Sequence, residues 1–306
     1  MADFTTTMSS IGVFDAHLIK AYQQIYLVEQ ANLAKGLDSL VTKRFSDKAQ
    51  TISFPKYSQL SLATTALTDK EDPASTVMAD AEITLTALEY GNTSQITVYA
   101  DAMSGGLPQL GTVAVHAKNM VETQEKLLIL AGEAGSNELT VNATNEASTA
   151  STEVLTAAWV KRARNKLARV GAQKPWSCII HPDVLHDLMI ETGTNAWNEQ
   201  ARYSENVRVF SVGIPEFAGF TFYESALVTV NTDAGSSSVD TYHTQFFGFN
   251  AFGKFVNIEP QMRLTGPFDK LGRFYNIGWY GLFKYGLIDT DYHWIVTSAS
   301  SIGSNA

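Results

Sequence analysis

The fold is decided by one stretch of the chain, residues 151–193, with the sequence STEVLTAAWVKRARNKLARVGAQKPWSCIIHPDVLHDLMIETG. Between residues 153 and 170, apolar side chains recur every three or four positions, which predicts an amphipathic helix. We expect Ser151 as its N-cap, Glu153 in its first turn and Gly171 as the left-handed residue at its end. The predicted apolar face comprises Leu155, Trp159, Ala163, Leu167 and Val170, and the opposite face carries Lys161, Arg162, Arg164, Lys166 and Arg169.

A buried strand and a second helix follow this helix. Pro175 precedes the apolar run at residues 176–180, whose β-branched end is typical of a strand. Pro182 fits a first helical position, and Asp183 follows it in the first turn. An apolar stripe then continues through residues 184–189, so the sequence predicts a helix that ends at Gly193.

This helix-strand-helix unit resembles the middle of the major capsid proteins of tailed bacteriophages, and most closely the group typified by the coat protein of phage N4. The resemblance extends in the same order through GIPEFAGF at residues 213–220, FNAFG at 249–253 and GWY at 278–280. It implies an α+β fold of the Hong Kong-97 type. Such a fold has an N-terminal arm, an extended β-hairpin loop, a long spine helix in a peripheral domain and a mixed α/β axial domain.

The resemblance and the periodicity together predict five segments. Residues 1–48 form an N-terminal arm with an amphipathic helix, and residues 49–103 form the extended loop and β-hairpin. Residues 104–150 hold the spine helix, expected at 113–131, and an exposed linker at 132–150. Residues 151–260 contain the central unit and the axial domain, and residues 261–306 return as strands to the peripheral domain. Further short strands are expected at 207–212, 219–223, 227–230, 241–249 and 254–258.

The segment 49–103 has the features of a protrusion. A strand is predicted at residues 51–57, a polar stretch without periodicity at 61–80, and a hairpin of strands at 83–87 and 96–100 that turns at 90–93. The resemblance implies that this loop overlaps an adjacent subunit, whereas the alternative is a surface hairpin with a flexible insert. The predicted intersubunit contacts are Phe14, Leu18, Tyr22, Phe54, Lys56, Tyr57, Asp69, Lys70 and Glu71.

Composition favours a protein that covers its surface with copies of itself. Charged residues are 17% of the 306 residues and apolar residues 45%, which leaves little charge for the surface of a monomer. The net charge of −9 has the wrong sign for a protein that grips nucleic acid, but it permits a container for DNA. The single cysteine, Cys178, lies in a predicted strand and is expected to be a core residue in a reducing cytoplasm.

The sequence shows no catalytic or ligand-binding constellation. Residues 248–254 have the spacing of a phosphate-binding loop, but Phe255 replaces the required hydroxyl and the segment is a predicted strand. His181 and His186 are five positions apart, which separates them on a helix, and Asp289 with Asp291 is interpreted as a solvated turn. No secretory signal is predicted, and the most apolar segment, residues 275–288, is too short for a membrane span. The basic helix face is interpreted as solvated.

The resemblance therefore implies a major capsid (coat) protein of a tailed double-stranded DNA phage, with no catalysis and no cofactor. It implies hexameric and pentameric capsomers, a portal protein, scaffolding or decoration proteins, and packaged DNA held without sequence-specific contacts. Assembly would take place in the host cytoplasm, and the mature protein would reside in the virion. The alternatives are an encapsulin-like nanocompartment shell that encloses enzymes and, more distantly, an uncharacterised enzyme.

Overall fold

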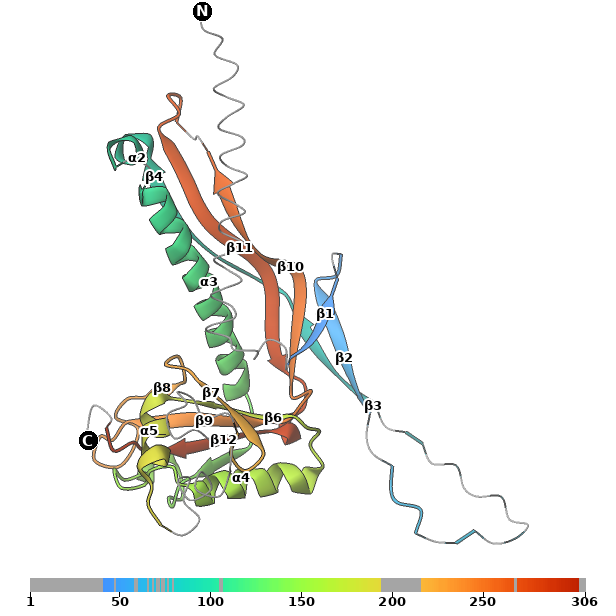
Figure 1. The fold of residues 1–306 in the computed structure, drawn as a ribbon. Helices are drawn as coiled ribbons and strands as arrows, with labels where there is room; N and C mark the ends of the chain where they lie inside the picture. Colours follow the sequence, from blue (N-terminus) through green and yellow to red (C-terminus); the bar gives the residue numbers. More distant parts are fainter. Residues whose placement is uncertain are drawn as a thin grey trace, which may run out of the picture.

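A computed structural model describes residues 41–302 except 47, 58–59, 65, 68, 70–71, 73–74, 76, 79, 105–106, 194–215 and 267–268. The described chain has an elongated lobe, a compact lobe at one end of it, and a loop that projects to the side (Figure 1). The predicted N-terminal helix and the predicted strand at 207–212 lie outside the described residues, as do Phe14, Leu18 and Tyr22.

The elongated lobe is a four-stranded sheet covered by one long helix, α3 (Leu107–Glu133) (Figure 1). The strand order is β1 (Thr42–Phe45), β10 (Phe252–Thr265), β11 (Phe274–Leu287) and β4 (Leu88–Thr97). β1 is parallel to β10, and the other pairs are antiparallel. The predicted spine helix is thus confirmed. Its buried side chains, Met120 and Ile129 among them, pack against Phe252, Trp279 and Phe283 of the sheet.

The predicted turn at residues 90–93 is wrong, because these residues lie in the middle of the continuous strand β4. Gly91 pairs with Tyr280 of β11, and a Cβ atom at Gly91 would lie 2.7 Å from the carbonyl oxygen of Trp279. The glycine therefore permits two backbones to approach closely. The chain then turns into the short helix α2 (Val98–Ser104), so the predicted strand at 96–100 ends at Thr97.

The compact lobe is built on a second, mixed sheet with the order β5, β12, β9, β6, β7, to which β8 adds beside β9. β6 (Trp176–Ile180) confirms the predicted central strand, and all five of its side chains are buried. α5 (Pro182–Ile190) begins at Pro182 as predicted, after the His181 ring accepts a hydrogen bond from the Asp183 amide, but it ends before Gly193. The other strands are β5 (Glu138–Thr140), β7 (Phe220–Glu224), β8 (Val230–Asn231), β9 (Thr241–Phe247) and β12 (His293–Ser298).

The central helix, α4 (Ala157–Val170), begins later than predicted. Its N-cap is Thr156 and not Ser151, because Val154 forms a parallel bridge with Ala299 and keeps the preceding chain extended. Glu153 accordingly lies outside the helix, where its carboxylate accepts a hydrogen bond from the Ala150 amide at 2.8 Å.

The end of α4 is as predicted, since Gly171 adopts a left-handed φ of 74°. Its buried face differs from the predicted one and comprises Ala157, Val160, Ala163 and Leu167. Trp159 is only partly buried, and Val170 is 42% exposed.

The predicted exposed linker at residues 132–150 is wrong. β5 pairs in parallel with β12, and the short 3-10 helix η2 (Glu146–Ser148) follows. Val141 and Thr149 are completely buried, so this segment forms part of the compact lobe.

The projecting hairpin is formed by β2 (Thr51–Tyr57) and β3 (Asp80–Thr86), which pair antiparallel. The predicted strand at 51–57 is confirmed, but its partner makes this a hairpin of β2 with β3, not of β3 with β4. Phe54, Leu85 and Phe255 form a small buried cluster that fixes the hairpin to the elongated lobe.

Candidate functional site

The loop between β2 and β3 exposes an unusual amount of apolar surface. Every described residue from 60 to 78 is exposed, and the loop extends away from both lobes (Figure 1). Its large apolar side chains are Leu60 (51% exposed), Leu62 (84%), Leu67 (77%), Val77 (89%) and Met78 (53%). A concentration of exposed apolar side chains marks a contact surface, because the loop's own subunit gains nothing from holding them in water.

The predicted contact residues have different places in this region. Tyr57 is 65% exposed where the loop begins, and Asp69 is exposed within the loop. Phe54 is only 2% exposed, so the structure places it in the core of its own subunit rather than at a contact surface. Lys70 and Glu71 lie outside the described residues.

Lys56 anchors the hairpin by an ion pair within the subunit. Its Nζ lies 2.7 Å from Asp289 Oδ1 and 3.6 Å from Asp291 Oδ2. Burial lowers the pKa of Lys56, but the hydrogen bond and charge of Asp289, aided by Asp291, raise it overall above its ordinary value. Asp289 is 9% exposed, so the expectation of a solvated acidic turn is wrong for this residue. The pair fixes the direction in which the hairpin leaves the lobe.

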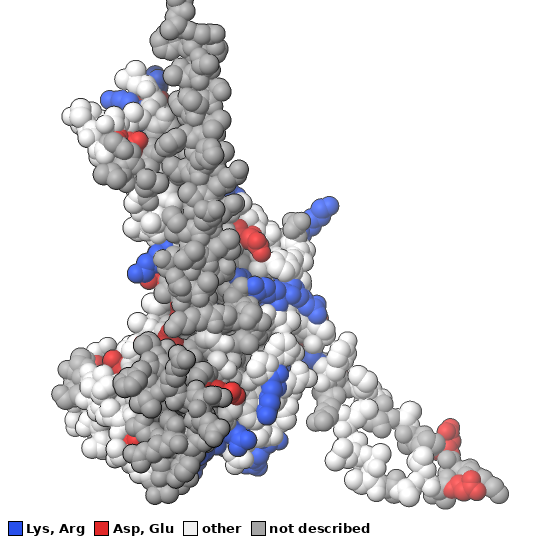
Figure 2. Space-filling model, in the orientation of Figure 1, with Lys and Arg blue, Asp and Glu red and all other residues white. Residues whose placement is uncertain are grey.

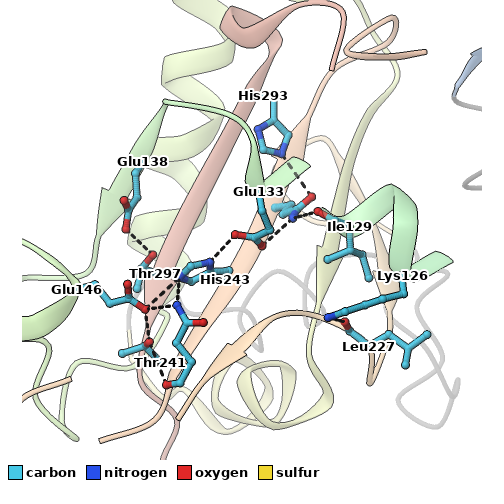
Figure 3. A network of polar contacts seen from close by, with 12 residues as sticks. Lys126, Ile129, Glu133, Glu138, Glu146, Leu227, Thr241, His243, His293 and Thr297 are labelled. Carbon is cyan, nitrogen blue, oxygen red and sulfur yellow. Dashed lines mark hydrogen bonds and ion pairs between the residues drawn. The ribbon is translucent and has the colours of Figure 1, made fainter. Parts of the chain in front are cut away.

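A polar network joins the end of α3 to the compact lobe (Figure 3). His243 of β9 lies between two carboxylates, with Nδ1 2.6 Å from Glu133 Oε2 and Nε2 3.1 Å from Glu146 Oε1. Gln245 donates to the Ile129 carbonyl at 2.9 Å and to Glu133 Oε1 at 3.0 Å. No sequence motif indicates this network, since its members lie far apart along the chain.

The geometry of the network favours a protonated His243. A neutral imidazole has one N–H group, whereas both ring nitrogens of His243 face carboxylate oxygens. Burial lowers the pKa of His243, but Glu133 and Glu146 raise it overall. Burial raises the pKa of Glu133, but the hydrogen bond and charge of His243 lower it overall. Burial likewise raises the pKa of Glu146, but hydrogen bonds from Thr241 and Asn231, aided by the charge of His243, lower it overall. The network is therefore a charged joint of two acids and one cation.

The fold matches solved capsid structures over nearly its whole length. The capsid of Ralstonia phage GP4 aligns with a TM-score of 0.70 at 13% identity, covering 87% of this chain and 88% of that one. The chain has the Hong Kong-97 capsid fold. The cyanophage Pam1 capsid aligns with a TM-score of 0.65 at 12% identity, over 86% and 90% of the two chains. A virus-like particle from Pyrococcus furiosus aligns with a TM-score of 0.54 at 10% identity, over 91% and 98%. The sequence matches no protein-family model and none of the curated proteins.

The residues that were considered for nucleotide binding, metal binding or nucleophilic catalysis have structural roles in this fold. Lys254, from the stretch with phosphate-loop spacing, is buried in strand β10 and donates to Gln124 Oε1 at 3.1 Å. Cys178 is buried, and the resulting desolvation raises its pKa well above the ordinary value, which disfavours the reactive thiolate. Within the described residues, no group of three or more His, Cys, Asp or Glu side chains could hold a metal ion. No helix among them is long and apolar enough to cross a membrane.

Proposed function

We propose that this chain is the major capsid protein of a tailed double-stranded DNA phage, and that its copies assemble into an icosahedral shell around the genome. The observation that carries the proposal is a projecting loop with five exposed, large apolar side chains on a capsid fold. A neighbouring copy that covers this loop would remove the unfavourable exposure in every subunit. The function is then structural, with no catalytic step, and the mature protein resides in the virion.

The loop can supply much of the driving force for assembly. Complete burial of five such side chains is worth up to about 7 to 15 kcal/mol per subunit before the costs of association. Those costs are of similar size, so the net gain per contact is modest. A closed shell repeats the contact around every capsomer, and closure makes a modest contact sufficient.

The proposal includes the predicted arm, extended loop, spine helix, axial domain and returning strands, with the segment after α3 assigned to the compact lobe. It also includes the predicted contacts of the N-terminal arm (Phe14, Leu18 and Tyr22) and of the loop (Tyr57, Asp69, Lys70 and Glu71). Its partners are further copies of the chain in hexameric and pentameric capsomers, a portal protein and scaffolding or decoration proteins. The ordered sequence motifs at residues 171–184, 213–220, 249–253 and 278–280 support placement near the coat protein of phage N4.

A second candidate is a nanocompartment shell that encloses proteins. It is favoured by the likeness to the virus-like particle from Pyrococcus furiosus, which covers 98% of that chain. The two candidates predict the same subunit and the same kind of contact. They differ in the contents of the particle.

The test begins with the purified protein. Light scattering and negative-stain electron microscopy should show capsomers or closed particles, and a monomer that persists at high concentration over a range of salt would refute a shell. Particles isolated from cells that produce the native protein then decide between the candidates. Long DNA and a single portal vertex support the phage capsid, whereas enclosed protein without DNA supports the nanocompartment.

A further inference from the structure

The outward face of α4 carries a stripe of three cations, Arg162, Lys166 and Arg169. Arg162, Lys166 and Arg169 are four and three positions apart, which places them on one face, opposite the buried Val160 and Leu167. The 14 residues of α4 include five cations and no acid. Arg162 and Arg169 are exposed and Lys166 is partly exposed.

These cations do not stabilise the helix by pairing with acids. Across the part of the chain that the structure describes, no ion pair reaches the three stripe residues. Like charges at these spacings repel one another, and only Arg169 lies in the last turn where the helix dipole favours a cation. No acid within the described part of the subunit therefore neutralises the charge of the stripe, which leaves it available to an anion from outside the subunit.

Aromatic rings hold two of the three cations in place. The Arg162 guanidinium lies 4.5 Å from the centre of the Trp159 ring, and Lys166 Nζ lies 4.8 Å from that of Trp294. A guanidinium held against an aromatic ring still has N–H groups that can donate to an outside acceptor. Figure 2 shows Lys and Arg side chains at the lower end of the molecule, where α4 lies in Figure 1. Such preorganised cations lose little freedom when they bind an anion.

We propose that this stripe contacts the phosphate backbone of double-stranded DNA at the inner wall of the shell. The inference rests on the proposed capsid function, which supplies DNA at high local concentration. Arg162 and Arg169 are separated by about 10 Å along the helix axis, which corresponds to the rise of about three base pairs along the axis of a DNA duplex.

A linear, regularly charged partner suits a straight row of cations better than a folded acidic protein, whose carboxylates are scattered over its surface. The net charge of −9 repels DNA from the rest of the chain. Contact confined to the stripe would hold the DNA weakly and without sequence preference.

The test compares two variants of the full chain with equal changes in charge. One carries Arg162→Gln, Lys166→Gln and Arg169→Gln; the control carries Lys48→Gln, Lys118→Gln and Lys270→Gln, which remove three exposed cations elsewhere. The probe is a labelled random-sequence DNA duplex, and fluorescence anisotropy gives its affinity for unassembled subunits between 50 and 200 mM salt. Loss of three phosphate contacts should reduce the slope of log K against log salt by about 2.7, while the control keeps the parent slope.

Three results would overturn the inference: a stripe variant with the parent slope, a control variant with the same loss, or a stripe that binds polyglutamate and not DNA. Closed shells provide a further test, because DNA added outside them should not bind if the stripe faces inward. Electron microscopy of the same preparations separates this inference from the proposed function. Shells whose subunits bind DNA independently of the stripe refute the inference alone, whereas a parent chain that forms no shells refutes the proposed function.

Discussion

Replacement of residues 60–79 by a short Gly-Ser link should separate folding from assembly. The described residues from 60 to 78 are all exposed, so the segment contributes little to the subunit core. Shortening a flexible loop changes its closure entropy by only about 0.6 kcal/mol per halving, so the unfolding free energy should change by less than about 1 kcal/mol. Assembly loses the burial of the five apolar side chains, a gross contribution of up to about 7 to 15 kcal/mol per subunit.

The assay applies circular dichroism, thermal melting and negative-stain microscopy to one preparation. We expect a folded subunit with an unchanged melting curve and no closed particles. A point variant of the intact loop gives finer control: Leu62→Ser, Leu67→Ser and Val77→Ser should also prevent closure. The matched variant Ser61→Ala, Thr64→Ala and Ser75→Ala changes polar side chains in the same loop and should assemble normally. Normal particles from the shortened chain would refute the reasoning, and an unfolded product would show that the loop supports the core.

Three further changes test the interior of the subunit. Trp159→Ala should lower the unfolding free energy by about 2 kcal/mol, roughly half the cost for a fully buried tryptophan, and a loss above 4 kcal/mol in urea titrations would contradict its partly buried place. Lys56→Met should cost about 1 to 3 kcal/mol, because it leaves the buried Asp289 carboxylate without its cation, and it should speed hydrogen exchange in β2 and β3; unchanged exchange would exclude the anchoring role. His243→Gln should destabilise most between about pH 4.5 and 6.5. Because the pKa of His243 is raised in the folded protein, the stability it contributes is complete below its ordinary pKa of 6.5 and is lost as the pH rises through its folded pKa. Because the pKa values of the two glutamates are lowered in the folded protein, the stability they contribute is lost as the pH falls below their ordinary pKa of about 4.5. A destabilisation that does not vary with pH would contradict the charged joint.

The sequence predicted correctly those helix and strand boundaries that depend on a few neighbouring residues. Pro182 set the start of α5, Gly171 set the end of α4, and the apolar run at 176–180 became a fully buried strand. In each case the decisive preference belongs to a few neighbouring residues, so one sequence contains it. The resemblance to capsid proteins added the arrangement of these elements, which periodicity alone did not supply.

The errors arose where a distant partner decides the local structure. Residues 90–93 have the composition of a turn, but their extended conformation is set by pairing with β11, almost two hundred positions later in the chain. Val154 is drawn into an extended bridge by Ala299, which shifts the start of α4. Asp289 looked like part of a solvated turn until the fold placed it beside Lys56. For the candidate site, sequence located the loop but did not identify its apolar side chains, because the stretch was recognised by its polar residues.

The polar network at Glu133 holds one end of a long helix. α3 has 27 residues and is therefore about 40 Å long, so a tilt of about 5° at one end displaces the other by about 3.5 Å. Apolar packing tolerates small sliding, whereas hydrogen bonds and ion pairs depend on direction. The contacts of Glu133 with His243 and Gln245 therefore restrict this tilt of α3. A displacement of a few ångströms at the far end of each subunit would accumulate around a ring of copies as a change of curvature. In the proposed shell, the angle at which α3 meets the compact lobe would determine how tightly a sheet of these subunits can bend.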